Sequence, residues 1–206
     1  DVLIDAPAGS ARSGVRVLLA HGAGAGMDTP FMAVIAQAVA AQGVEVWRFE
    51  FPYMQRMRRE GGRRPPDRMP ILLQAFAERL AAAGGAEGCV VAGKSMGGRM
   101  ASLLAATCPV RGWCALGYPF HPPGKPERLR TAHLVEIASP GLIIQGTRDP
   151  FGTQEEVEAL ALPASISRVW LADGNHDLVP RRASGHTAQA HWHAAAQALA
   201  DFVKRL

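Results

Sequence analysis

Cys89-Val-Val-Ala-Gly-Lys-Ser-Met-Gly-Gly-Arg99 is the stretch of sequence from which the fold can be predicted. The apolar run 89–92 predicts a buried strand, and the small residues of 98–106 predict a helix. Between them, residues 93–97 fit G-x-S-x-G, a sharp turn that lifts a serine hydroxyl above the end of a sheet. Glycine suits both flanking positions because strand and helix backbones would almost touch there. This order of elements makes Ser95 a candidate nucleophile.

The same region also fits a phosphate-binding loop. Gly88 to Ser95 match G-x-x-x-x-G-K-S, whose four middle residues must point free N–H groups at a phosphate. Here those four are Cys, Val, Val and Ala, which favour a paired strand without free N–H groups. Residues 81–87, where that motif needs a strand, are typical of a helix end. A nucleotide binder is therefore the less favoured interpretation.

The composition predicts one globular domain over residues 1–206, large enough to bury about 70% of its unfolded surface. No apolar run approaches 18 residues and no basic-then-apolar leader is present, so we expect neither a membrane span nor a signal peptide. Cys89, Cys108 and Cys114 have apolar neighbours and no regular spacing, which favours reduced thiols and a cytoplasmic location. The sequence contains no C-x-x-C or H-x-x-x-H, and we expect no metal or cofactor.

The net charge of +4 comes from a single segment, residues 54–68, which carries six arginines against Glu60 and Asp67. The six are Arg56, Arg58, Arg59, Arg63, Arg64 and Arg68. A nucleic-acid interface would add stacking aromatics, but only Tyr53 lies beside the segment, so we expect no nucleic-acid partner. We interpret the segment as a loop that either attracts anionic substrates or is solvated and paired with nearby acids.

Apolar runs and amphipathic patterns alternate along the chain. We expect strands at 15–20, 44–49, 89–92, 112–116, 141–145 and 167–171, with a short edge strand at 2–4. We expect helices at 30–41, 66–83, 98–106, 153–160 and 186–206. The pattern predicts an α/β fold with a mostly parallel sheet of about six strands, covered by helices on both faces. Ligands bind such sheets at the carboxyl ends of the strands.

Two further polar residues follow strands at that edge. Asp149 lies in the loop after the strand that ends at Gln145, and His176 in the loop after the strand that ends at Leu171. Serine becomes a nucleophile when a base takes its proton, which a histidine can do near neutral pH. A carboxylate then fixes the imidazole tautomer and stabilises its charged form. We therefore predict a triad of Ser95, Asp149 and His176.

The oxyanion of an acyl-transfer reaction needs two N–H donors. We call the G-x-S-x-G turn the elbow. Met96, at the start of the helix after it, would supply one donor, and Ala23 in the loop His21-Gly-Ala-Gly24 the other. We predict substrate contacts from Gly22, Gly24, Lys94, Tyr118 and Phe120. The last two begin an insert, residues 118–140, whose His121 and His133 are further candidates to line the pocket.

Each of these residues also has an ordinary structural interpretation. Ser95 could be a turn residue, Asp149 could cap a turn before Pro150, and His176 could be a hydrogen-bonded loop histidine. Under that interpretation the chain would be a catalytically silent interaction module. The presence of serine, histidine, aspartate and an oxyanion loop together favours an enzyme, because a scaffold needs none of them.

These motifs give the chain a resemblance to the α/β-hydrolases across nearly its full length. Within that superfamily it is similar to a small group of compact bacterial predicted hydrolases, whose eukaryotic relatives include a testis-expressed protein and a histone-acetyltransferase-complex subunit. The resemblance rests on five motifs: His21-Gly-Ala-Gly-Ala25, Phe51-Pro-Tyr-Met54, Gly93-Lys-Ser-Met-Gly-Gly-Arg99, Gly146-Thr-Arg-Asp-Pro-Phe-Gly152 and Asp173-Gly-Asn-His-Asp-Leu178. It implies the triad above, no leading antiparallel strands and no substantial lid. Residues 118–140 are the only insert long enough to cover the site.

The sequence therefore predicts a serine hydrolase that cleaves a small ester-like substrate through an acyl-enzyme, with anionic esters favoured if the arginine segment acts on the site. No membrane partner is expected, and the oligomeric state is not specified by the sequence.

Overall fold

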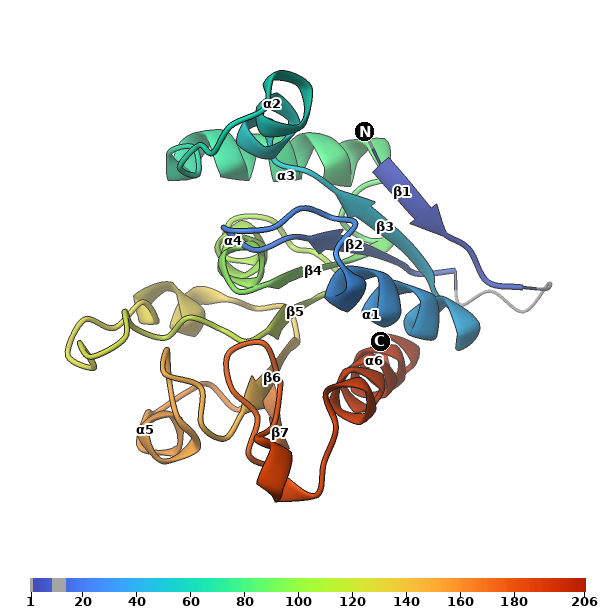
Figure 1. Cartoon of the computed structure of the whole chain (residues 1–206). Coiled ribbons are helices and arrows are strands. Elements are labelled where there is room, and N and C mark those ends of the chain that lie inside the picture. The colour runs from blue at the N-terminus through green and yellow to red at the C-terminus, as the bar shows by residue number, and fades with distance from the viewer. Residues whose placement is uncertain (1, 9–13) are drawn as a thin grey trace.

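The structure, a computed structural model that describes residues 2–8 and 14–206, is built around a seven-stranded sheet (Figure 1). The strands lie in the order β1-β3-β2-β4-β5-β6-β7, and every neighbouring pair except β1–β3 is parallel. Their bounds are β1 Val2–Asp5, β2 Arg16–Ala20, β3 Glu45–Phe49, β4 Cys89–Lys94, β5 Gly112–Leu116, β6 Gly141–Gly146 and β7 Ile166–Leu171. The predicted mostly parallel α/β sheet is confirmed, and the short edge strand expected at 2–4 is its seventh strand.

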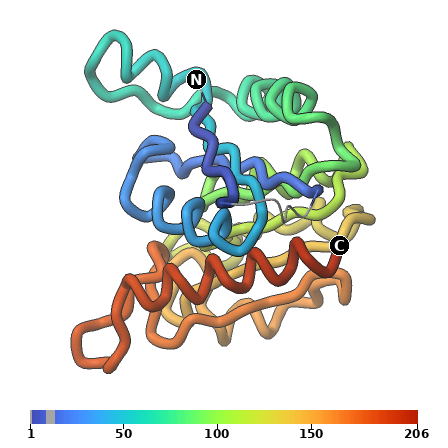
Figure 2. The backbone as a smooth tube through the Cα atoms, turned by 90° about the vertical axis from the view of Figure 1, so that its right-hand side faces the viewer, coloured from blue at the N-terminus to red at the C-terminus, as the bar shows by residue number. Residues whose placement is uncertain are grey.

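Helices cover both faces of the sheet, as predicted. On one face α1 and α6 lie side by side, and α3 and α4 pack on the other (Figures 1 and 2). The α-helices are α1 Pro30–Ala41, α2 Pro52–Glu60, α3 Met69–Ala82, α4 Met96–Ala105, α5 Gln154–Glu158 and α6 Ala188–Lys204. Two short 3-10 helices are η1 Ala132–Glu136 and η2 Arg182–Ser184. Because the helices cover the two faces of the sheet, the carboxyl ends of its strands lead into loops.

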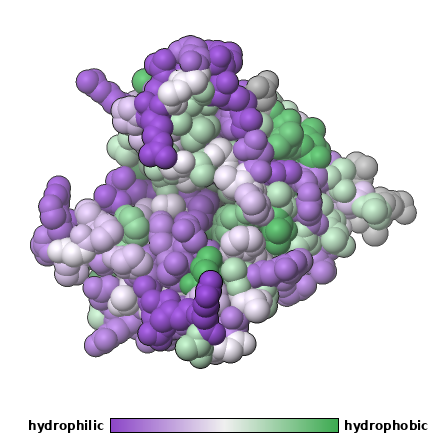
Figure 3. Space-filling view, in the orientation of Figure 1, coloured by the Kyte–Doolittle hydropathy of each residue, from purple (hydrophilic) through white to green (hydrophobic). Residues whose placement is uncertain are grey.

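The first strand corrects one expectation. β1 pairs antiparallel with β3, so the chain does have a leading antiparallel strand at the sheet edge. Its position is fixed by Asp5, which accepts two hydrogen bonds from the Arg48 guanidinium at 2.8 and 3.1 Å. The outer side of β1 exposes Leu3 and Ile4, and a hydrophobic area covers this strand at the upper right of Figure 3.

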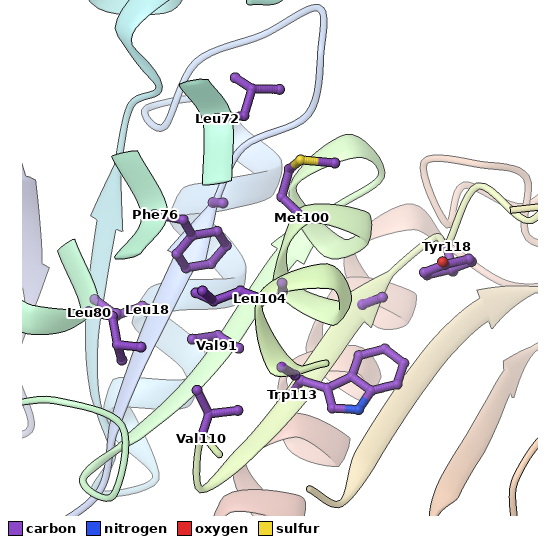
Figure 4. Packing of buried hydrophobic residues seen from close by; sticks show 14 of the residues in the cluster. Leu18, Leu72, Phe76, Leu80, Val91, Met100, Leu104, Val110, Trp113 and Tyr118 are labelled. Atoms are coloured by element: carbon purple, nitrogen blue, oxygen red, sulfur yellow. The ribbon is translucent and has the colours of Figure 1, made fainter. Parts of the chain in front are cut away.

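Alternating side chains of the central strands form one core on each face. Leu18 and Val91 point toward α3 and α4, whereas their neighbours Val17 and Val90 point toward α1 and α6. Figure 4 shows the first of these cores, in which α3 and α4 meet over the sheet. Its members include Leu72, Phe76, Leu80, Met100, Leu104 and the fully buried Trp113. Both faces being covered explains why the central strands are continuous apolar runs.

The pairing of β4 within the sheet excludes a phosphate-binding loop. Cys89–Ala92, the middle of that motif, pair with β2 on one side and Val90–Lys94 with β5 on the other. Backbone N–H groups in such a ladder have partners within the sheet and cannot surround a phosphate. The nucleotide-binding interpretation is therefore wrong.

The arginine segment, predicted as a loop, is helical in its first half, residues 54–60. Pro52 opens α2, which ends at Gly61 with φ of 73°, and α3 begins at Met69 rather than at Pro66. Residues 61–68 connect the two helices because consecutive prolines at 65 and 66 disfavour helical backbone before them. A helix was missed here because the arginine charge obscured a short amphipathic pattern.

Carboxylates pair with several arginines of this segment. Arg58 contacts Glu50 at 2.5 Å and Asp28 at 3.0 Å. Arg56 pairs with Asp67, and Arg64 with Glu60. These contacts favour the second interpretation of the segment, in which its charges are paired with nearby acids.

Replacement of Gly97 by Ala tests the close packing of α4 on the sheet. A Cβ there would lie 2.6 Å from the carbonyl oxygens of Ala20, the last residue of β2, and of His21, which follows it. Helix propensity favours Ala by about 1 kcal/mol, but overpacking of this kind costs about 1–3 kcal/mol and should dominate. We expect Gly97→Ala to lower the urea midpoint, whereas Gly88→Ala, with no atom within 4 Å of its new Cβ, should leave it nearly unchanged. An unchanged midpoint in Gly97→Ala would contradict the packing.

Candidate active site

Ser95 lies at the junction of β4 and α4 in a backbone conformation that few non-glycine residues adopt. Its φ is 51° and its ψ is −112°, and its N–H donates to the carbonyl oxygen of Leu116 at 3.0 Å. A Cβ at Gly93 would come within 2.3 Å of the Gly97 carbonyl carbon, so the turn needs glycine as predicted. Strain of this kind persists where the surroundings hold the backbone in place.

The three predicted triad residues lie together. His176 Nε2 is 2.7 Å from Ser95 Oγ, and His176 Nδ1 is 2.8 Å from Asp149 Oδ2. Ser95 follows β4, Asp149 follows β6 and His176 follows β7, so the carboxyl edge of the sheet brings residues up to 81 positions apart into contact. The geometry is that of a nucleophile, a base and the carboxylate that orients the base.

Asp149 is fully buried, and its carboxylate is held by three hydrogen bonds. Besides His176, it accepts from the Gln145 amide at 2.9 Å and from the backbone N–H of Phe151 at 2.8 Å. Gln145 is itself fixed, because its Oε1 accepts from the N–H of Tyr118 at 2.7 Å. Burying a carboxylate is costly without such partners. Gln145 is therefore a positioning residue for Asp149.

The loop that carries His176 is held by Lys94, the residue before Ser95. Lys94 Nζ donates to the carbonyl oxygen of His176 at 2.8 Å and lies 3.2 Å from an Asp177 carboxylate oxygen. Burial lowers the pKa of Lys94, and the nearby carboxylates of Asp177 and Asp149 act in the opposite direction. The Phe151 ring stacks on His176 with a centroid distance of 4.1 Å. These contacts restrict the imidazole to one position.

The loop 22–26, predicted to supply one oxyanion donor, is fixed by two aromatic side chains. His21 Nδ1 lies 2.6 Å from the carbonyl oxygen of Gly22, and His21 Nε2 accepts from the N–H of Phe51 at 3.1 Å. Tyr53 Oη donates to the carbonyl oxygen of Ala23 at 2.9 Å. Burial lowers the pKa of His21 and raises the pKa of Tyr53, so both act as neutral hydrogen-bonding groups.

Two backbone N–H groups are available beside Ser95. Among the described residues, neither Ala23 nor Met96 donates its N–H to a protein acceptor. Met96 is the first residue of α4, where intrahelical partners do not exist. Gly22 approaches the Ser95 side chain, because a Cβ built on it would lie 3.8 Å from Ser95 Cβ. The two N–H groups are thus candidates for the predicted oxyanion hole.

A cavity of about 640 Å³ opens beside Ser95 and His176. Its walls come from the loop after β2, the start of α1, the loops after β6 and β7, and α6. The Phe31 and Trp192 rings meet edge to face at a centroid distance of 5.5 Å and give one wall its apolar character. The side chains that line it include Phe31, Met32, Lys94, Phe151, Asp177, Val179 and Trp192.

Most of the predicted substrate contacts lie at this cavity, and two do not. Gly22, Ala23, Gly24 and Lys94 line it. Tyr118 and Phe120 are fully buried in the core, where their ring centroids lie 4.8 Å apart. The insert 118–140 folds against α4 instead of covering the site, so the structure does not support substrate contacts from its first residues.

The two histidines of the insert also lie elsewhere. His121 contacts Glu156 at 3.4 Å, and His133 lies 2.8 Å from Ser102 of α4. Neither lines the cavity. The insert therefore packs on α4 and does not form a lid over the cavity.

The sequence did not reveal several residues that shape the site. Tyr53 and Gln145 position its loops, while Phe31, Phe151 and Trp192 line its cavity. A usable signal existed for Gln145, because a polar residue ends an otherwise apolar strand. No local pattern marks Trp192, which comes from α6 near the other end of the chain.

The chain is similar to a known protein family and to several solved structures. A family model described as an alpha/beta hydrolase domain matches residues 13–204. An α/β serine hydrolase homologue from Coxiella burnetii is 20% identical with a TM-score of 0.67, and the match covers 99% of this chain and 89% of that one.

Two further structures have the same fold. A monoacylglycerol lipase from Paleococcus ferrophilus is 13% identical with a TM-score of 0.71, covering 100% of this chain and 98% of the lipase. An α/β serine hydrolase without lid from Xanthomonas campestris is 21% identical with a TM-score of 0.65, covering 100% and 86%. Since the family model spans almost the whole sequence and the sheet has the matching architecture, this chain belongs to the α/β-hydrolase family.

Proposed function

We propose that this chain is a serine hydrolase that cleaves an ester-like bond through an acyl-enzyme. The observation that carries the proposal is the position of His176, which bridges Ser95 Oγ at 2.7 Å and Asp149 Oδ2 at 2.8 Å. A silent interaction module would have no need of this chain of hydrogen bonds, nor of a strained serine beside two free N–H groups.

In the proposed reaction, Ser95 Oγ attacks the carbonyl carbon of the ester while His176 Nε2 takes its proton. Asp149 accepts from Nδ1–H and stabilises the imidazolium that forms. The negative oxygen of the tetrahedral intermediate accepts from the N–H groups of Met96 and Ala23. His176 then returns the proton to the leaving alkoxide, and a water molecule repeats the sequence on the acyl-enzyme.

The cavity lining supports a substrate with an apolar group. Phe31, Met32, Phe151, Val179 and Trp192 contribute aromatic and aliphatic surface. Its two charged residues, Lys94 and Asp177, contact each other at 3.2 Å, which reduces their effect on a ligand. No arginine of the described chain lines the cavity, so a preference for anionic esters has little structural support.

Two narrower expectations stay predictions. The first is the similarity to the testis-expressed protein and the acetyltransferase-complex subunit. A cytoplasmic location is supported by Cys89, Cys108 and Cys114, all of which are free thiols. None of the described helices is long and apolar enough to cross a membrane.

Replacement of Ser95 by Ala tests the nucleophile. Turnover of p-nitrophenyl esters of increasing acyl length should fall by roughly four to six orders of magnitude, because no other group can form the acyl-enzyme. The melting temperature should change little, since the hydroxyl contributes little packing. The matched control is Ser165→Ala, an exposed serine outside the cavity, which should retain full turnover. Full activity in Ser95→Ala would refute the proposal.

Replacement of Asp149 by Asn tests the carboxylate. The amide keeps the volume but cannot stabilise the imidazolium, so kcat should fall by roughly four orders of magnitude. Asp177→Asn serves as the comparison, because Asp177 lines the same cavity but contacts Lys94 instead of His176. A loss smaller than about tenfold in Asp149→Asn, or an equal loss in both variants, would assign the orienting role to another group.

The pH dependence of kcat/KM tests the base. Only neutral His176 can accept the serine proton, so the rate should rise with pH through one ionisation and then level off. His21 and His133 should not contribute near neutral pH, because burial lowers the pKa of both, that of His133 to about 4. A rate that falls as the pH rises from 5 to 8 would exclude His176 as a general base.

A further inference from the structure

A second group of polar side chains lies where α4 meets the insert, outside the cavity beside Ser95. Ser102 of α4 is fully buried, and its Oγ lies 2.8 Å from His133 Nε2 of η1. Ser102 Oγ also donates to the carbonyl oxygen of Arg99 at 2.8 Å. This contact joins two segments that are 31 residues apart and fixes η1 on the helix that begins with the elbow.

Two arginines flank this contact. Arg99 is three residues before Ser102, on the same side of α4. Arg130 is three residues before His133, and its carbonyl oxygen accepts from Tyr118 Oη at 2.8 Å. The Ser102–His133 contact holds η1 against the side of α4 that carries Arg99. In agreement with this placement, burial and Arg99 both lower the pKa of Arg130 and of His133. We call Arg99, Arg130 and His133 the basic cluster.

The basic cluster has no matching acid. Neither Arg99 nor Arg130 takes part in an ion pair or a side-chain hydrogen bond among the described residues, and Arg99 Nε is buried without a partner. Burial lowers the pKa of Arg130, and the nearby cations Arg99 and Arg128 lower it further. By contrast, the buried Arg48 and the partly buried Arg16 and Arg148 each pair with a carboxylate.

Such an arrangement is unfavourable in the protein alone. Like charges repel more strongly where burial lowers the local dielectric, and an unpartnered buried donor costs stability. A bound anion would reduce the repulsion between the like charges and would give the unpartnered donor an acceptor. Both arginines are half-buried, and only Nε of Arg99 is sealed from solvent without a partner, so their terminal nitrogens remain accessible. Guanidinium groups match the oxygens of phosphate with paired N–H donors.

We infer that the basic cluster is a binding site for a phosphate group, held between the guanidinium groups of Arg99 and Arg130. His133 is neutral near pH 7, because burial and Arg99 lower its pKa to about 4. The Ser102 hydroxyl donates its hydrogen to the carbonyl oxygen of Arg99, so the Ser102 oxygen accepts from His133 Nε2–H. This hydrogen bond fixes the neutral imidazole at the side of the site. The site lies on the same helix as the elbow but uses none of the residues assigned to ester cleavage.

The surroundings distinguish two sources of the phosphate. Leu129 and Val135, next to the cluster in sequence, are 47% and 69% exposed. A free phosphate ion would make no use of these apolar side chains, whereas a phosphate monoester with an apolar body could contact them. Inorganic phosphate and phenyl phosphate are therefore the two probes.

The test measures the melting temperature in phosphate and in sodium chloride of equal ionic strength. Binding with a Kd of about 1 mM would raise it by roughly 3–6 °C in 10 mM phosphate. Arg130→Gln and Arg99→Gln should each weaken binding, measured by titration calorimetry, at least tenfold. Arg99→Lys, which keeps the charge but loses the fork, should be intermediate and replaces Arg99→Gln if that variant fails to fold. Arg63→Gln, an exposed arginine of the α2–α3 connection, is the charge-matched control and should bind like wild type.

A spectroscopic readout places the ligand. Phosphate should raise the pKa of His133 in an NMR titration, because an anion offsets the effect of Arg99 on the imidazole. Ser95→Ala should bind phosphate as wild type does, which separates this site from the proposed hydrolase. Tighter binding of phenyl phosphate than of phosphate would identify an organic monoester as the ligand, and equal binding would identify the free ion. Equal melting temperatures in phosphate and chloride, or equal losses in Arg63→Gln and Arg130→Gln, would overturn the inference.

Discussion

The close approach of backbones at Gly93 and Gly97 is the constraint on which the site depends. A Cβ at Gly93 would meet the start of α4, and a Cβ at Gly97 would meet the carbonyl groups that end β2. The chain can therefore turn from β4 into α4 within one residue, which leaves Ser95 with a φ of 51°. The same turn exposes the N–H of Met96 beside the loop after β2. The proposed nucleophile and the proposed oxyanion donor at Met96 thus both depend on this close packing.

The buried carboxylate links this turn to the far side of the sheet. Asp149 has no exposed surface, and a charge there is tolerated because Gln145, His176 and the Phe151 N–H all donate to it. Lys94 then holds the His176 loop from the strand that carries Ser95. Each of the three proposed catalytic side chains is therefore fixed by a residue from a neighbouring strand or loop. A rigid set of supports of this kind is what positioning for catalysis requires.

Residues with strong local signals were predictable from the sequence. The G-x-S-x-G turn between a strand and a helix indicated Ser95, and parallel strands explain why Asp149 and His176 meet it. Contacts set by tertiary packing were not predictable. The position of Trp192 depends on how α6 crosses the sheet, and Tyr118 and Phe120 enter the core because the insert folds onto α4. The helix α2 was missed because the arginines, several of which pair with acids, made the segment resemble a solvated loop.

The most direct test of the central claim is to find the atom that becomes acylated or phosphonylated. The protein would be incubated with a fluorophosphonate, digested, and its peptides analysed by mass spectrometry. We expect one adduct per chain, on Ser95 within the peptide that contains residues 89–99, and loss of the adduct when His176 is replaced by Ala. An adduct on any other residue, or none on the folded protein, would contradict the account.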